Sequence, residues 1–171
     1  MRFVKASDLK RGMRLGRPIY NRKGELVYDI YHRLIDADIV QMRNNKIMGV
    51  FALDAAEPVP PMSDTEREYD RQRFLNVYAL RDEMQKILFN HRANRIETIA
   101  ESIVSFFEVF KKRIDFSQSV RSRDEYVCSH SVNVAILVTL MGTKLGITNA
   151  DKLTAVKAAL LHDIGKYVVP D

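Results

Sequence analysis

The sequence has little cysteine, glycine and proline, and it lacks a long uncharged apolar run. Its single cysteine, Cys128, rules out an internal disulfide and fits a reducing compartment, so we predict a cytoplasmic protein. Seven glycines and five prolines argue against a sandwich of many short, turn-rich strands. No stretch approaches the roughly 18 apolar residues of a membrane-spanning helix, and residues 1–8 lack the apolar core of a signal peptide. We therefore expect neither export nor a membrane partner.

The basic residues are numerous but dispersed. The formal net charge is +5, and the hydrophobic content of 46% is that of a folded globular protein. Lysines and arginines are spread over several segments and are not gathered with aromatic residues on one element, so solvated helix faces explain them better than a nucleic-acid surface. We expect no DNA partner, although the surplus positive charge would help to steer a phosphate-bearing substrate.

The first part of the chain, residues 1–55, predicts a small β-rich regulatory module. Loose alternation over residues 13–20 is followed by a turn signal at Asn21–Gly24. Residues 25–31 are then rich in β-branched and aromatic side chains, which completes the pattern of a hairpin. We also expect a closing strand over Gly49–Leu53.

Between these strands the pattern indicates a short helix over Asp36–Asn44. We expect Asp36 to be its N-cap, because aspartate is among the preferred residues at that position. The helix would make its apolar contacts through three residues, namely Ile39, Val40 and Met42.

Residues 56–63 form a proline-rich linker, since Pro58, Pro60 and Pro61 can continue neither a helix nor a central strand. No further proline occurs before Pro170, and apolar residues recur at helical spacing. Residues 64–171 therefore predict an all-α bundle. The fold class is α+β: a small β-rich module followed by this helical part.

Four helices are expected in the helical part. Ser63 with Glu66 and Thr148 with Asp151 form capping boxes at two helix starts, and Gly142 or Gly146 would end the third helix. The apolar stripes of the four helices are, in order, Leu80, Met84, Ile87 and Leu88; Ile96, Ile99, Ile103, Phe106, Phe110 and Ile114; Val127, His130, Val134, Leu137 and Met141; and Leu153, Val156, Leu160 and Asp163.

Two ionisable residues fall on these otherwise apolar stripes. Burying the Asp163 carboxylate among leucine and valine is unfavourable unless it is paired or coordinates a metal, and His130 has the corresponding place on the third helix. On a continuous helix His162 would lie about 100° from Asp163, so that both could bind one ion. Gly165 and Lys166 would then stop the helix and put a cation beside that ion. Histidine with aspartate suits a first-row divalent metal such as Mn, Fe or Zn.

Each of these residues also has an ordinary structural explanation. A lone histidine on an apolar face is usually a core residue, and Lys166 alone is a common charge near a helix C-terminus. A metal site is favoured by the combination of a histidine in one stripe with His-Asp-x-Gly-Lys at the end of the next helix. Cys128 lies about 200° round the helix from His130, so we interpret it as a packing residue. His32 and His91 have no companion ligands, and no role is assigned to them.

Two segments resemble the opening signatures of the HD-GYP domain, a branch of the HD phosphohydrolase superfamily that hydrolyses the bacterial messenger cyclic-di-GMP. They are Asp124–Ala135 (DEYVCSHSVNVA) and Ala158–Lys166 (AALLHDIGK). The second segment is similar to HD enzymes in general, and the first, with its spacing to the second, to the HD-GYP branch. The resemblance covers about residues 124–171. Residues 1–55 are weakly similar to regulatory modules that precede some such domains.

This resemblance implies that His130, His162 and Asp163 are metal ligands, with Asp163 bridging two divalent ions, Mn or Fe. It implies catalytic roles for Asp163 and Lys166, with Lys166 also binding a phosphate of a cyclic dinucleotide substrate. Some family members hold a third metal with a glutamate where this chain has Tyr126, which implies a two-metal centre here. Two cations roughly 3.5–4 Å apart can acidify a bridging water and neutralise the attacked phosphodiester, so no nucleophilic side chain is required.

The family pattern continues past the His-Asp pair with further ligands and a Gly-Tyr-Pro segment, whereas this sequence stops at Asp171. We therefore expect an N-terminal fragment of a phosphodiesterase, with a partial metal site and little or no activity by itself. Helix stripes that lack later packing partners favour a homodimer or a swapped assembly through the helical region. One alternative is a naturally truncated or degenerate HD domain that senses a nucleotide or binds a protein. An HD nucleotidase outside the HD-GYP branch is another.

Overall fold

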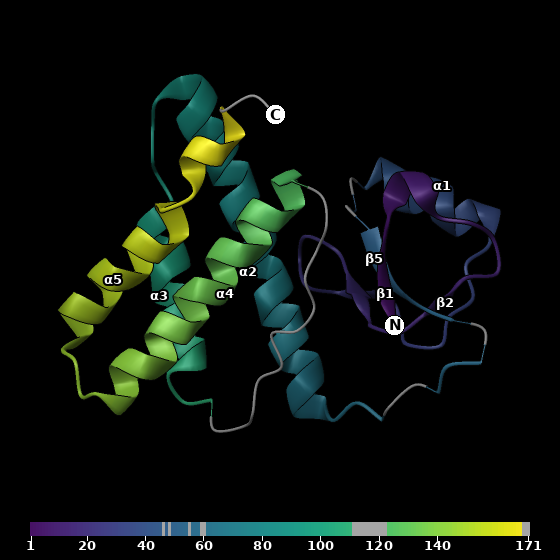
Figure 1. Ribbon diagram of the computed structural model, residues 1–171, viewed down its shortest axis with the longest axis horizontal. Helices are drawn as coiled ribbons and strands as arrows, with labels where there is room; N and C mark the ends of the chain where they lie inside the picture. The colour runs from purple at the N-terminus through teal and green to yellow at the C-terminus, as the bar shows by residue number, and fades with distance from the viewer. Residues whose placement is uncertain (46, 48, 55, 59–60, 111–122, 169–171) are drawn as a thin grey trace. The chain divides into compact units, whose positions relative to one another are not determined.

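The computed structural model describes residues 1–45, 47, 49–54, 56–58, 61–110 and 123–168, and Figure 1 shows strands early in the chain and helices later. The predicted α+β class is confirmed. The described residues up to Phe74 form one compact unit, and those from Leu75 onward form a second. Among the described helices, none has both the length and the apolar character needed to span a bilayer.

The elements are, in chain order, β1 (Arg2–Lys5), η1 (Ala6–Asp8), β2 (Arg14–Leu15), β3 (Ile19–Tyr20), β4 (Leu26–Tyr28), α1 (Asp36–Asn44), β5 (Gly49–Leu53), α2 (Asp64–Asn90), α3 (Ile96–Phe107), α4 (Arg123–Lys144), α5 (Asn149–Leu161) and η2 (Ile164–Tyr167). The η elements are 3₁₀ helices.

The first unit contains an antiparallel sheet in the order β1-β5-β2. The strand predicted at Gly49–Leu53 is confirmed as β5, which lies in the centre of this sheet. The sequence analysis assigned no strand to β1, which pairs with β5 along its whole length. The buried core joins Leu15 of β2, Met42 of α1 and Val50 of β5, so α1 packs on the sheet.

The predicted hairpin is present as the antiparallel pair of β3 and β4, shorter than expected. In its turn the Asn21 side-chain oxygen accepts hydrogen bonds from the backbone N–H groups of Lys23 at 2.8 Å and Glu25 at 3.0 Å. Gly24 has a φ of 80°, a conformation that favours glycine. The preceding residues Arg14–Leu15 belong to β2 and pair with β5, so they are not part of the hairpin.

Helix α1 has the predicted bounds, but the prediction of its N-cap was wrong. The N-cap residue is Ile35, and the carboxylate of Asp38 accepts the Ile35 backbone N–H at 3.0 Å. The same oxygen lies 2.7 Å from Nε2 of His32, so Asp38 is held from two sides. Val40 is exposed and does not make the predicted apolar contact, because the helical period turns it away from the buried face.

Burial raises the pKa of Asp38, but the hydrogen bonds from Ile35 and His32 lower it by more, so the folded pKa lies below the ordinary value. A lowered folded pKa means that the stabilisation is present above the unfolded pKa of about 3.9 and is lost as the pH falls further. We predict that Asp38→Ala lowers the free energy of unfolding of the first unit by about 1–2 kcal/mol at pH 7.

Urea unfolding followed by the NMR amide signals of α1 measures this difference, and Asp36→Ala is the matched control because Asp36 is exposed in the same helical turn. The difference in the free energy of unfolding between the wild-type chain and the Asp38 variant should become smaller when the measurement is repeated at pH 3. A deficit that does not change with pH would contradict the assigned role of the carboxylate.

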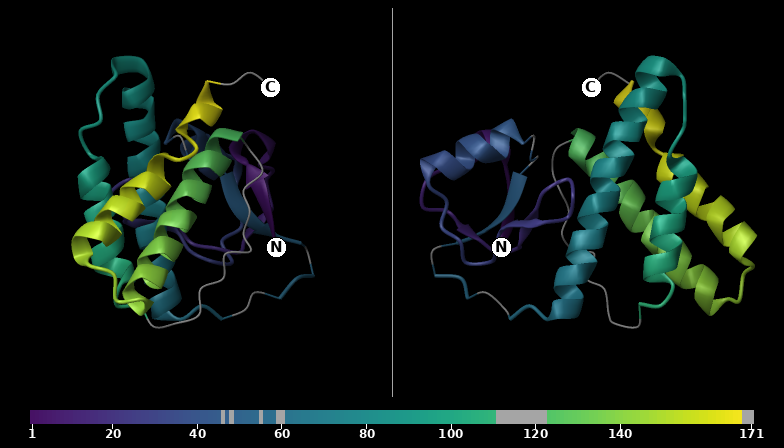
Figure 2. Two further views of the ribbon diagram at one scale, coloured as in Figure 1. Left: turned by 60° about the vertical axis from the view of Figure 1, so that its left-hand side comes forward. Right: turned by 180° about the vertical axis from the view of Figure 1, so that it is seen from behind.

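The second unit is helical. Helix α4 packs against α5, and α3 packs against both, as Figure 2 shows from two sides. The Ser63–Glu66 capping box is confirmed, since the Ser63 backbone N–H donates to Glu66 Oε2 at 2.7 Å and the Glu66 N–H donates to Ser63 Oγ at 3.3 Å. Thr148 is the N-cap of α5 and accepts the Asp151 N–H at 3.2 Å, which is one of the two bonds of the predicted box. Gly146 follows the end of α4 with a φ of 67°, as predicted for a helix-ending glycine.

The predicted stripe on α4 was right for Val127, which is buried, and wrong for the rest of its course. The face of α4 that is fully buried carries Cys128, Val132, Ala135 and Thr139. His130 is half-buried and Met141 is exposed. Apolar residues surround most of this helix, so their spacing could not select a face, and packing against α3 and α5 decided it. On α5 the predicted residues Val156 and Leu160 are buried, and the predicted contact of Ile114 lies outside the described residues.

A buried carboxylate on α2 connects that helix to the start of α3. The side chain of Glu83 is fully buried, and its Oε1 accepts the backbone N–H groups of Asn94 and Arg95, the latter at 2.7 Å. Arg95 is the N-cap residue of α3, so Glu83 accepts a backbone N–H at the helix start that has no acceptor within the helix.

We predict that Glu83→Ala lowers the free energy of unfolding by about 1–3 kcal/mol, because two backbone N–H groups lose their acceptor. Urea unfolding followed by helical circular dichroism measures the change. The control is Gln85→Ala, at an exposed position of the same helix, with an expected change within about 0.5 kcal/mol. Equal stability of the two variants would show that Glu83 does not hold the start of α3.

Candidate metal centre

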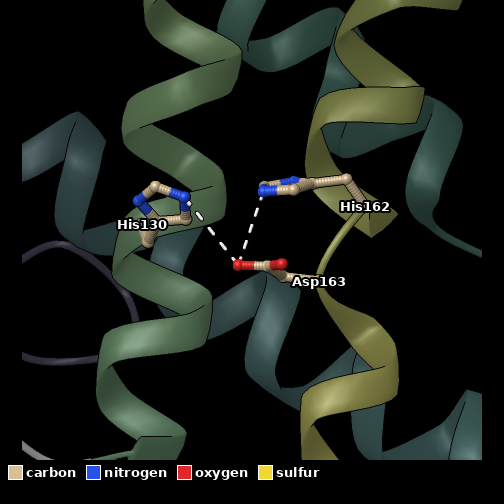
Figure 3. Close-up of side chains that lie close together, drawn as sticks. All are labelled: His130, His162 and Asp163. Carbon is tan, nitrogen blue, oxygen red and sulfur yellow. Dashed lines mark ion pairs between the residues drawn. The ribbon is translucent and has the colours of Figure 1, made fainter.

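Three side chains from separate elements converge in the second unit (Figure 3). Nε2 of His130 lies 3.8 Å from Oδ2 of Asp163, and Nε2 of His162 lies 3.4 Å from the same oxygen. One ligand atom from each residue lies within 4.8 Å of the others. The predicted site residues are therefore brought together, although His130 belongs to a half-buried face of α4 instead of the buried stripe.

The His-Asp pair does not lie within a helix, which corrects the expected arrangement. Helix α5 ends at Leu161, His162 is its C-cap, and Asp163 precedes the 3₁₀ turn η2. Gly165 and Lys166 are part of η2, so they do not end α5. The Asp163 carboxylate points toward His130, and its side chain is only 12% exposed.

The ring of His162 is oriented by a main-chain contact. Its Nδ1 lies 2.8 Å from the carbonyl oxygen of Ala159, which can only accept a hydrogen bond. Nδ1 therefore carries the proton, and in the neutral ring the Nε2 lone pair faces Asp163. The sequence analysis did not identify Ala159, because a carbonyl acceptor can belong to any residue type.

Lys166 lies at the edge of this cluster. Its Nζ donates to Oδ2 of Asp163 at 2.7 Å, and the two residues meet because side chains three positions apart lie on the same side of a 3₁₀ turn. Burial raises the pKa of Asp163, but the Lys166 hydrogen bond and the nearby His162 and His130 lower it by more. The pKa thus lies below the ordinary value, and the carboxylate is ionised at neutral pH, as a metal ligand must be.

The donor set fits a divalent metal. Metal–ligand bonds of about 2.0–2.2 Å place neighbouring donor atoms roughly 3–3.5 Å apart, close to the observed separations from Asp163 Oδ2. Two imidazole nitrogens and one carboxylate oxygen suit first-row transition metals. Lys166 already contacts the shared oxygen, so an ion bound there would displace the ammonium group toward solvent.

The other residues considered earlier do not join the cluster. Cys128 is fully buried, with Sγ 3.8 Å from Sδ of Met84, which confirms its interpretation as a packing residue. His32 contacts Asp38 in the first unit. His91 follows the end of α2 with a φ of 53° and is exposed. The side chain of Tyr126 lies outside the described part of the chain, so the two-metal count stays a prediction.

We predict that Mn²⁺ stabilises the chain through this cluster. At an ion concentration of 100 times the dissociation constant, the expected gain is about 2.7 kcal/mol, visible as a rise in Tm by calorimetry. Asp163→Asn should remove most of this gain, because an amide oxygen carries no net charge. Glu101→Gln, the same chemical change at an exposed position of α3, is the control. An equal Mn²⁺-dependent gain in both variants would rule out Asp163 as a ligand.

The C-terminal part of the chain, which carries these residues, resembles known proteins. Residues 127–171 match the sequence model of the HD domain family. The 3′3′-cGAMP-specific phosphodiesterase 3 of Vibrio cholerae serotype O1 is 41% identical over 54 residues, which are 32% of this chain and 12% of that protein. The chain thus spans a small part of this relative's length, and no solved structure gives a significant match. The predicted resemblance is confirmed for the C-terminal part of the chain, which carries sequence of the HD-type phosphohydrolases.

Proposed function

We propose that this chain contributes to a metal-dependent phosphodiesterase of the HD-GYP branch that hydrolyses cyclic-di-GMP. The observation that carries the proposal is the convergence of His130, His162 and Asp163, with Lys166 at the edge. The HD-domain match and the likeness to a phosphodiesterase that acts on 3′3′-cGAMP support it. Both nucleotides are rings closed by two phosphodiester bonds, so they present the same reacting group.

In this proposal the three convergent side chains would hold the ions, with Asp163 as the ligand that both ions would share. The Ala159 carbonyl engages Nδ1 of His162, which leaves Nε2 as the nitrogen that would bind an ion. A bound pair of divalent ions would supply an acidified water and would neutralise the charge of the attacked phosphodiester. No side chain then has to act as the nucleophile.

Lys166 is proposed to bind the substrate phosphate. Its side chain is 52% exposed, so the ammonium group can leave Asp163 and reach a ligand above the cluster. An ammonium group that donates to a phosphate oxygen forms a charge-assisted hydrogen bond and adds positive charge where the transition state becomes more negative. The contact with Asp163 keeps this cation at the site before the substrate binds.

We also propose that the 171 residues by themselves turn over little or no substrate. Within the described residues, the group that could hold a metal offers three ligands. First-row divalent ions usually bind more than one or two protein donors each, so three ligands are too few to hold two ions. Binding of a nucleotide phosphate by Lys166 and a single ion does not require the full set.

The test measures binding and turnover together. With Mn²⁺ present, calorimetric titration with cyclic-di-GMP and with 3′3′-cGAMP should give binding that Lys166→Ala weakens about tenfold, the equivalent of about 1.4 kcal/mol. Lys144→Ala is the control, because Lys144 is an exposed lysine at the end of α4. Chromatography of the same samples detects linear product. Robust turnover would contradict the proposed inactivity, and the absence of both binding and turnover would contradict the proposed function.

A second candidate function is regulation, in which the HD segment binds a nucleotide or a protein partner without turnover. The three-ligand cluster favours it, since one ion can be held where two cannot. The intact mass of the native protein from its own cells separates the two functions. A mass well above 19.7 kDa supports the phosphodiesterase, and a mass equal to it supports the regulator.

A further inference from the structure

Behind the metal cluster, the residue that follows Lys166 contacts the helix that carries His130. The hydroxyl oxygen of Tyr167 lies 2.9 Å from Sγ of Cys128. Cys128 is fully buried on α4 and faces away from the cluster, since it precedes His130 by two helical positions. Either atom can donate in this contact, because a thiol and a phenol are both donors and acceptors.

The contact joins η2, a short element, to a helix that is distant in sequence. This element is a single 3₁₀ turn with no fully buried residue. Its backbone hydrogen bonds, from the N–H of Lys166 to Asp163 and from that of Val168 to Gly165, are local. A side chain at Gly165 would meet no neighbouring atom, so packing there does not hold the turn. The Tyr167–Cys128 contact, in contrast, joins η2 to α4 across 39 positions of sequence.

Each residue of this contact is close in sequence to a residue of the cluster. Cys128 is on the same α4 turn as His130, and Tyr167 is in the turn that follows Asp163. The contact therefore constrains the separation of His130 and Asp163, which is 3.8 Å between Nε2 and Oδ2. The contact of Cys128 with Met84 of α2 in turn fixes the position of the thiol.

We infer that Tyr167 is a positioning residue for the metal cluster. Its hydrogen bond with Cys128 keeps η2 at a fixed position relative to α4. The inference rests on the proposed metal-dependent function and deepens it. Tyr167 touches neither an ion nor a substrate in this role. The bond holds Asp163 at the distance from His130 that a shared ion requires.

The test compares Tyr167→Phe, Cys128→Ala and the double variant with the wild-type chain by calorimetric titration with Mn²⁺. Each single variant should bind Mn²⁺ about 3- to 10-fold more weakly, which corresponds to the loss of one hydrogen bond. The double variant should be no weaker than the single ones, because both changes remove the same bond. Cys128→Ser keeps a donor and acceptor at this position and should restore most of the affinity.

Tyr28→Phe is the matched control. It removes a tyrosine hydroxyl that donates to Gln41 at 2.8 Å in the first unit, so it should leave Mn²⁺ affinity unchanged. Wild-type affinity in Tyr167→Phe, or losses that add in the double variant, would overturn the inference.

A metal-free readout separates this inference from the proposed function. Amide hydrogen exchange at Lys166 and Val168 should be about 3- to 10-fold faster in Tyr167→Phe and Cys128→Ala, since both amides belong to the turn that loses its anchor. Unchanged exchange would overturn the positioning role even if Mn²⁺ binds. If the wild-type chain does not bind Mn²⁺ but the variants still exchange faster, the Tyr167–Cys128 contact is supported and the metal-dependent function is overturned.

Discussion

The site in the second unit depends on a charged carboxylate, that of Asp163, in a place that is mostly removed from water. Such a group is stable only when it is paired, and here Lys166 donates to it while the rings of His130 and His162 lie within 4 Å. They come from α4, from the end of α5 and from η2. The packing of α4 against α5 and the short 3₁₀ turn are therefore both prerequisites for the cluster.

Within the described residues, histidines contact two aspartates, Asp38 and Asp163, and the surroundings explain why Asp163 and not Asp38 resembles a metal ligand. The carboxylate of Asp38 accepts the Ile35 backbone N–H and contacts His32, so it serves as a local cap for α1. The Asp163 carboxylate instead faces Nε2 atoms of two histidines that come from different helices. Convergence of several donors, and not the proximity of one histidine, is what an ion requires.

Several helix ends and turns could be predicted because their signals are local, although the N-cap of α1 was wrong. The Ser63–Glu66 box, the N-cap Thr148, the Asn21–Gly24 turn and the helix-ending Gly146 are all observed. Each depends on a side chain that hydrogen-bonds a few residues away, or on a φ that glycine adopts easily. Partners distant in sequence carried no such signal. For that reason the sequence analysis did not predict the pairing of β1 with β5, or the hydrogen bond that the Arg95 backbone N–H donates to Glu83.

The sequence by itself determined which residues could form the site, because histidine and aspartate are chemically suited to a metal, and these residues with Lys166 lie in the segment that matches the HD domain. Tertiary structure decided how they meet. Periodicity could not select the buried face of an α4 that is apolar on most sides, and it extended α5 past Leu161. Packing against α3 and α5 made that selection, because the burial of apolar surface depends on neighbours that spacing along one helix does not reveal.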